Sequence, residues 1–94
     1  MRLRYRAAAK ADVEEAREWY RQHSPALEER FAGAVAQTIE GILEHPRAYE
    51  VVEPDVRRVR VNVFPYLVYY AVEDDTVVVL AVIHGKRHPD AWKR

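Results

Sequence analysis

Cysteine is absent from this chain of 94 residues, and glycine is scarce, with three residues. The lack of cysteine excludes a disulfide framework and a thiolate metal site, and it is consistent with a reducing compartment. No apolar run approaches the length of about 20 residues that a membrane-spanning helix needs. The N-terminal arginines are not followed by an apolar segment, so we expect no signal peptide, no membrane partner and a soluble cytoplasmic protein.

A net charge is also missing, because 15 basic residues balance 15 acidic ones. The charges are unevenly distributed along the chain. Residues 1–10 hold four bases and no acid, residues 11–56 hold eleven acids and four bases, and residues 57–72 hold three arginines and no acid. A protein that binds nucleic acid over its whole surface is usually basic overall. This chain can therefore offer only a local cationic patch.

The length allows one domain, residues 1–94, with a core of its own. Residues 1–6 alternate between apolar and basic side chains, which predicts a short half-buried strand. Residues 7–22 and residues 25–45 carry apolar side chains at helical spacing, which predicts two consecutive helices. The apolar stripes and their edges place the following residues in the expected core: Ala9, Val13, Ala16, Trp19, Tyr20, Leu27, Phe31, Val35, Ile39 and Ile42.

Short signals mark the ends of these elements. Ser24 is favourable as the N-cap of the second helix, Pro25 is favourable as its first residue, and Pro46 ends it. Residues 47–56 are expected to form an irregular connection. A short extended piece at Tyr49–Val52 is an open alternative.

Three segments rich in β-branched residues follow and predict an antiparallel meander. Phe64-Pro65 and Asp74-Asp75 are expected to form its turns. Residues 77–83 are apolar on both faces, which predicts a strand that is central or covered on both sides. In the first segment the residues expected on the buried face are Val59, Val61 and Val63. Those expected on the other face are Arg58, Arg60 and Asn62.

The order strand, helix, helix, strand, strand, strand predicts an α+β fold. The N-terminal strand would join an antiparallel β-sheet, and the helical hairpin would pack on one face of that sheet.

Three stretches of the chain carry a family resemblance. They are Arg4-Tyr5 with Ala8, Lys10, Asp12 and Ala16; the turn and strand Phe64-Pro65-Tyr66-x-x-Tyr69-Tyr70; and the closing His84-x-x-Arg87-x-Pro89-x-x-Trp92. In their order and spacing they resemble the RelE/ParE superfamily, the toxins of bacterial type II toxin–antitoxin modules. The likeness covers essentially the whole chain and is nearest to the ParE-type, or plasmid stabilisation, branch.

The resemblance implies a cognate antitoxin and one of two activities. ParE-like members inhibit DNA gyrase, a topoisomerase. RelE-like members cleave mRNA in the ribosomal A site with clustered basic residues and a late tyrosine or histidine. A third alternative is a degraded toxin that retains only antitoxin binding. A toxin dimer and a heterotetramer with the antitoxin are both open.

Cleavage of RNA through its 2′-hydroxyl needs an acid, a base and cations around the phosphorane. Arg58 and Arg60 could supply charge, His84 or His88 could transfer a proton, and Arg87 could hold a phosphate. The second predicted strand has no lysine, however, and no tyrosine follows Arg87. The neutral net charge also disfavours ribosome binding. We therefore expect a non-enzymatic inhibitor, with the endoribonuclease as the alternative.

A toxin that acts by binding needs an exposed patch rather than a catalytic pair, and Trp and Arg contribute most to many interfaces. The candidate contacts with the target or the antitoxin are Arg58, Arg60, Tyr70, Arg87, His88, Trp92, Lys93 and Arg94.

Several of these residues have an ordinary structural alternative. Arg58 and Arg60 could be surface charges paired with Glu73 or Asp74. His84 could be a hydrogen-bonded residue at a strand end, and Trp92 could pack on the sheet.

No cofactor or metal is expected. The histidines lack metal-ligand spacing, because Gly85 and Pro89 interrupt the stretch that holds His84 and His88. The chain also has no glycine-rich phosphate loop, no serine–histidine–acid set and no paired carboxylate motif.

Overall fold

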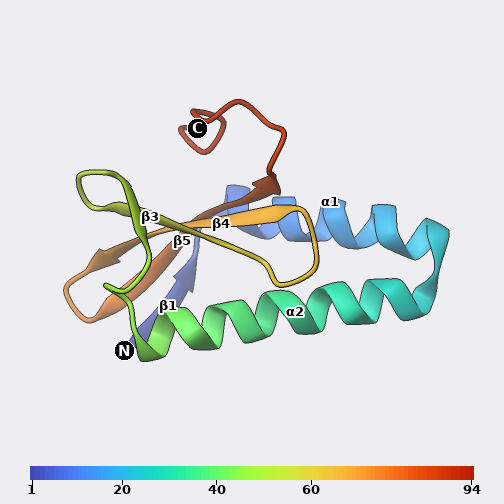
Figure 1. The fold of residues 1–94 in the computed structure, drawn as a ribbon, viewed down its shortest axis with the longest axis horizontal. Helices are drawn as coiled ribbons and strands as arrows, with labels where there is room; N and C mark the ends of the chain where they lie inside the picture. The colour runs from blue at the N-terminus through green and yellow to red at the C-terminus, as the bar shows by residue number, and fades with distance from the viewer.

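A computed structural model describes residues 1–94 and places two helices against one side of a five-stranded sheet (Figure 1). The elements in chain order are β1 (Arg2–Tyr5), α1 (Ala7–His23), α2 (Pro25–Glu44), β2 (Glu50–Glu53), β3 (Val56–Arg60), β4 (Tyr66–Glu73) and β5 (Thr76–His84). The expected α+β class is confirmed. Neither helix combines the length and the apolar character that crossing a bilayer would require.

The sheet has the order β1-β5-β4-β3-β2 and is mixed. The meander of β3, β4 and β5 is antiparallel, as predicted. β1 instead pairs in parallel with β5, with Leu3 opposite Val77, so the expectation of a purely antiparallel sheet is wrong for this strand. Alternation of side chains reports which face is buried. It does not report which distant strand will be the neighbour or in which direction that strand runs.

β2 is a strand that the expected element order did not contain. It pairs with β3 at the sheet edge, with Glu50 opposite Arg58. The alternative prediction of an extended piece at Tyr49–Val52 is therefore correct, although the observed strand lies one residue further along the chain. Arg57 Nη1 donates to the carbonyl oxygens of Arg47 at 3.0 Å and Tyr49 at 2.8 Å, which holds the connection between α2 and β2.

The helical hairpin forms as predicted. Ser24 Oγ accepts a hydrogen bond from Leu27 N–H at 3.3 Å, and α2 begins at the residue after this cap. Glu28, only 8% exposed, accepts hydrogen bonds from Arg17 Nε at 3.1 Å and Arg21 Nε at 3.0 Å, which joins the two helices. The Arg21 bond is the main reason that the pKa of Glu28 lies below its ordinary value.

The main core lies between the hairpin and the inner face of the sheet, and its aromatic rings meet at close range. The ring centroids of Tyr20 and Phe31 are 5.0 Å apart, and those of Phe31 and Phe64 are 5.3 Å apart. Two residues expected in or against this core lie outside it: Trp19 is 53% exposed and Val63 is 72% exposed. Trp19 lies just beyond the buried stripe of α1, and the backbone of Val63 leaves the strand alternation after β3 has ended.

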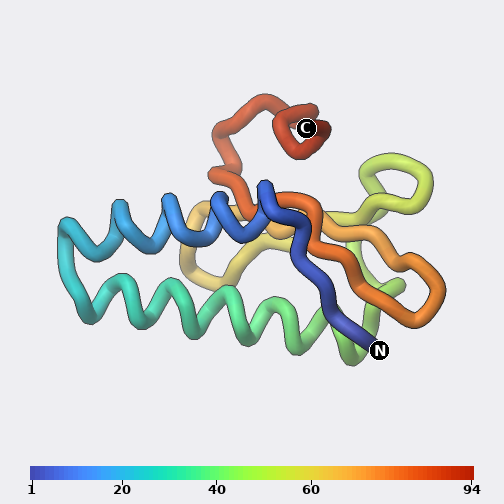
Figure 2. The backbone as a smooth tube through the Cα atoms, turned by 180° about the vertical axis from the view of Figure 1, so that it is seen from behind, coloured from blue at the N-terminus to red at the C-terminus, as the bar shows by residue number.

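A second apolar cluster covers the outer face of the sheet, away from the helices. β5 contributes Val78, Leu80 and Ile83 to this cluster and other valines to the main core, so the prediction of a doubly covered strand is confirmed. The C-terminal segment, residues 85–94, curls over the outer face (Figure 2). The ring of Trp92 stacks on that of Tyr69 with centroids 5.9 Å apart, so Trp92 does pack on the sheet.

Candidate functional site

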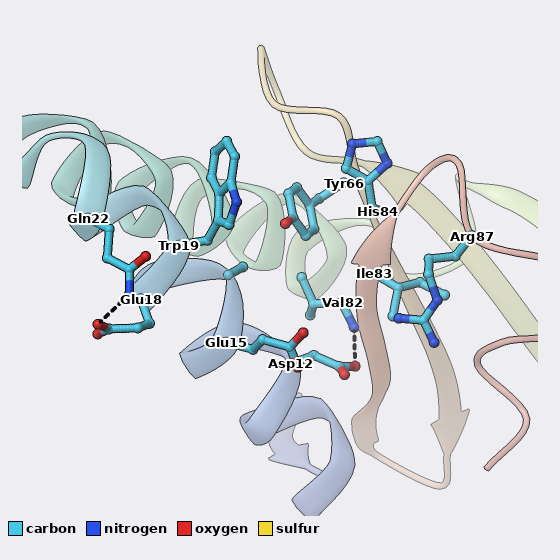
Figure 3. A pocket seen from close by; sticks show the side chains of 11 residues that line it. Asp12, Glu15, Glu18, Trp19, Gln22, Tyr66, Val82, Ile83, His84 and Arg87 are labelled. Carbon is cyan, nitrogen blue, oxygen red and sulfur yellow. Dashed lines mark hydrogen bonds between the residues drawn. The ribbon is translucent and has the colours of Figure 1, made fainter.

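A groove of about 400 Å³ opens between α1 and the C-terminal end of β5 (Figure 3). Residues three or four positions apart share one face of a helix, and this spacing forms the α1 wall. That wall consists of Asp12, Glu15, Ala16, Glu18, Trp19 and Gln22. The residues of the opposite side that carry chemistry are Tyr66, His84 and Arg87.

His84 lies at the end of β5, where its ring meets that of Tyr66 edge to face, with centroids 5.4 Å apart. His84 Nδ1 accepts a hydrogen bond from the backbone N–H of Lys86 at 3.0 Å, so the neutral imidazole carries its proton on Nε2. Burial raises the pKa of Tyr66, and the charge of Glu15 raises it further. The phenol therefore remains protonated at neutral pH and can donate a hydrogen bond.

The α1 wall of the groove is acidic. Asp12 accepts hydrogen bonds from Arg94 Nη1 at 2.7 Å and from the backbone N–H of Val82 at 3.0 Å. Glu15 on the wall and Arg87 across the groove take part in none of the ion pairs of the structure. Glu18 pairs with Arg21 of the same helix, so Glu15 is the carboxylate of this wall that would repel the phosphate groups of a polyanion.

Arg58 lies on the outer face of the sheet and is held by β2. Arg58 Nε donates to Glu50 Oε1 at 2.7 Å, and a second nitrogen lies 3.5 Å from Tyr69 Oη. The bond to Glu50 is the main cause of a raised pKa at Arg58, and it lowers the pKa of Glu50. The expected pairing of Arg58 with Glu73 or Asp74 is wrong, because the strand that places Glu50 opposite Arg58 was not anticipated.

Arg60, Tyr70 and His88 lie in three different surroundings. Arg60 is exposed and lines a separate groove of about 290 Å³ beside α2. Tyr70 is fully buried on the inner face, where its hydroxyl donates to Pro46 O at 2.7 Å and burial raises its pKa to about 12. His88 is exposed, and its Nδ1 accepts a hydrogen bond from Asp90 N–H at 3.0 Å.

The last two cations of the C-terminal segment, Lys93 and Arg94, form ion pairs with other parts of the molecule. Lys93 Nζ pairs with Glu53 of β2 at 2.5 Å, and Arg94 pairs with Asp12 of α1. Hydrogen bonds to these carboxylates raise the pKa of both Lys93 and Arg94. Neither charge is free in this arrangement, whereas Arg87 has no carboxylate partner.

The structure does not bring the four residues of the endoribonuclease alternative to one place. His84 and Arg87 share the groove beside α1, Arg60 lines the groove beside α2, and Arg58 is held by Glu50. Cleavage of RNA needs its acid, base and cations within reach of one phosphate. No group of three or more histidine, aspartate or glutamate side chains is placed to hold a metal ion.

Sequence reasoning missed the α1 wall of the groove. The available signal was the three-residue spacing of Asp12, Glu15 and Glu18, which places the three carboxylates along one side of a helix. Trp19 was assigned to the core, although it is exposed at the mouth of this groove and stacks on His23 with ring centroids 4.1 Å apart.

The chain is similar to known toxins over nearly its whole length. A family model described as the ParE toxin of the type II toxin–antitoxin system parDE matches residues 3–89. A structure of the chromosomal ParDE system from P. aeruginosa aligns with a TM-score of 0.78 and 15% identity, covering 89% of this chain and 95% of that one. The isolated E. coli RelE toxin aligns with a TM-score of 0.63 and 20% identity, covering 94% and 87%. A comparison with curated proteins gives no match.

Proposed function

Because this chain belongs to the ParE toxin family of type II toxin–antitoxin systems, we propose that it binds and inhibits a DNA topoisomerase such as gyrase. A cognate antitoxin would neutralise it by covering the helical hairpin and the sheet edge with an amphipathic segment that is disordered when free. Its site of action would be the cytoplasm, where its target acts on DNA. Inhibition would come from binding alone, with no catalytic step.

The charge of one groove favours a binding inhibitor over an endoribonuclease. This groove holds His84 and Arg87, and its facing wall carries carboxylates. Asp12, Glu15 and Glu18 line that wall, and Arg87 is the only arginine that lines the groove. Arg94 pairs with Asp12 and Arg21 pairs with Glu18, which leaves Glu15 facing Arg87 and gives the groove no excess of positive charge. Binding of RNA gains most of its free energy from neutralised phosphates, so this balance of charge disfavours an RNA substrate. A groove with charges of both signs is better suited to a protein surface.

The contact surface of the proposed inhibitor would include Arg87 and His88. Both are exposed and lie in the turn that follows β5. Trp92, Lys93 and Arg94 would hold the C-terminal segment in position, because each contacts another element of the fold.

The test adds purified toxin to a gyrase supercoiling assay and, separately, to a translation extract with a reporter mRNA. We expect loss of supercoiling, intact mRNA and recovery of supercoiling when the protein from the adjacent reading frame is added. Arg87→Ala should weaken inhibition. Arg30→Ala, which removes an exposed and unpaired charge on α2, should not.

The RelE-like endoribonuclease is the second candidate, because the fold matches that of E. coli RelE and because His84 and Arg87 share one groove. Cuts in the ribosomal A site that disappear in Arg87→Ala, with gyrase unaffected, would establish it in place of the first. Absence of both activities together with tight binding of the adjacent-frame protein would indicate a toxin that retains only antitoxin binding.

A further inference from the structure

Three residues other than glycine have a positive φ: Asp55 at 69°, Val63 at 75° and Asp74 at 56°. Aspartate tolerates this region because its short polar side chain can bond to the local backbone. Valine is among the least suited residues, since its branched Cβ crowds the backbone. Val63 therefore carries a conformational strain that the two aspartates largely avoid.

Folding does not explain the valine at this position. Its side chain is 72% exposed, whereas Val61 and Phe64 in the same loop are 0% and 6% exposed and hold the loop to the core. The backbone N–H of Val61 also donates to Tyr66 O at 2.9 Å, which closes the loop without using Val63. Asparagine or glycine would fit the same backbone with less strain. Backbone strain that folding does not require is found mainly at functional sites.

The loop that carries Val63 lies beside the turn after β5. The backbone N–H of Gly85 donates to Pro65 O at 2.8 Å, and the pairing of Tyr66 with His84 brings these two ends of β4 and β5 together. Figure 1 shows the loop, in yellow, and the end of β5, in red, at the same end of the meander. We call residues 61–65 and 84–88 together the Val63 tip.

The Val63 tip combines an exposed apolar side chain with unpaired positive charge. Lys86 and Arg87 are exposed, and neither takes part in an ion pair. The two segments of the tip contain no acidic residue. A complementary surface would therefore offer an apolar pocket surrounded by carboxylates.

We propose that the Val63 tip contacts the protein that this toxin inhibits, and that Val63 enters an apolar pocket with an acidic rim on that protein. This inference rests on the proposed function and specifies its contact surface. A nucleic acid would use the two cations, but its phosphate backbone has no pocket for a single aliphatic side chain. The antitoxin would bind elsewhere, on the hairpin and the sheet edge.

The experiment compares Val63→Asn with Val51→Thr, which alters the other strongly exposed valine, 56% exposed, in β2. Val63→Asn should melt at the wild-type temperature or up to about 5 °C above it, because strain is relieved. It should bind the antitoxin with unchanged affinity. The concentration of Val63→Asn toxin that half-inhibits gyrase supercoiling should be at least about tenfold higher than that of the wild type. Val51→Thr should match the wild type in melting temperature and in inhibition of gyrase, because Val51 lies in β2, at the sheet edge assigned to the antitoxin and away from the tip.

Three results would overturn the inference. Val63→Asn could inhibit as well as the wild type. It could melt well below the wild type and be matched in this by Val63→Gly, which would give the valine a folding role. It could lose antitoxin affinity in step with inhibition, which would place the tip in the antitoxin interface.

Failure of the proposed function is visible separately, as wild-type toxin that leaves gyrase active. The same variants are then compared by growth arrest after induction in cells without the antitoxin. Arrest that is lost in Val63→Asn and kept in Val51→Thr supports the tip, and arrest kept in both overturns it. The toxin could instead cleave mRNA, with cleavage kept in Val63→Asn and lost in Arg87→Ala. This result would assign the tip to nucleic acid and would also overturn the inference.

Discussion

Tyr69 and Tyr70 are neighbours in β4 and have opposite surroundings, because successive side chains of a strand point to opposite faces. Tyr70 belongs to the core beneath the helices, and its hydroxyl bonds to Pro46 O. Tyr69 belongs to the outer cluster and lies between Arg58 and Trp92. The tyrosine pair in the family motif is therefore largely structural, and neither hydroxyl is placed to act on a bound substrate.

Replacing Tyr70 with phenylalanine should cost about 1 kcal/mol of unfolding free energy, because Pro46 O loses its buried donor. The cost should appear as a lower urea midpoint with an unchanged slope. An unchanged midpoint would show that the hydroxyl makes no net contribution. The proposed inhibition of gyrase should be unaffected at saturating toxin.

At the scale of elements, the helical hairpin depends on one acidic side chain. Glu28 of α2 receives hydrogen bonds from Arg17 and Arg21 of α1, and it is the only charged residue among the buried ones. Because these bonds favour the ionised carboxylate, the pKa of Glu28 in the folded protein lies below 4.5, its ordinary value.

The resulting pH dependence has a definite sign. A depressed folded-state pKa stabilises the protein above the unfolded-state pKa, and this contribution is lost as the pH falls through the folded-state pKa. Thermal melts should therefore show wild-type stability falling more steeply than that of Glu28→Gln below about pH 4.5. Parallel curves for the two proteins would contradict this role of Glu28.

The helices could be predicted from the sequence because their signals are local: an apolar stripe on each helix, a serine cap and a proline where α2 begins, and a proline shortly after it ends. The partner of β1 could not, since parallel pairing with β5 joins segments about seventy residues apart, from Arg2↔Thr76 to Tyr5↔Val79. β2 was obscured because Glu50–Glu53 is short and carries charge at both ends. Because β2 was absent from the predicted order, Glu50 was not recognised as the partner of Arg58.

The candidate site was predictable only on one side. His84 and Arg87 were identified from the closing motif, and the structure places both in one groove. The facing wall was missed because Trp19 was assigned to the buried stripe, and one position along a helix turns a side chain by about 100°. The positive φ of Val63 has no local signal either, since glycine or asparagine would normally mark it.

At the scale of the whole molecule, residues 85–94 tie distant parts of the fold together. The segment contacts α1, β2 and β4 through three pairs: Arg94 with Asp12, Lys93 with Glu53, and Trp92 with Tyr69. It thereby covers an apolar sheet face that no helix protects. An uncovered apolar face of this kind promotes association.

Trp92→Ala should therefore lower the unfolding free energy by about 2 kcal/mol, roughly half the cost of removing a fully buried tryptophan. Trp19→Ala is the matched control and should cost less than about 1 kcal/mol, because surface changes are usually small. Urea unfolding of the two variants provides the comparison. Equal losses would mean that the C-terminal segment does not protect the outer face.

The stoichiometry of inhibition distinguishes a toxin that acts by binding from one that acts by catalysis. Toxin is titrated against a fixed concentration of gyrase, and residual supercoiling is measured at each ratio. For a toxin that acts by binding, we expect supercoiling activity to fall in proportion to added toxin, to reach its minimum near equimolar amounts and to return when antitoxin is added. Undiminished supercoiling at excess toxin, with mRNA in a translation extract cut by trace amounts of the same preparation, would contradict this expectation.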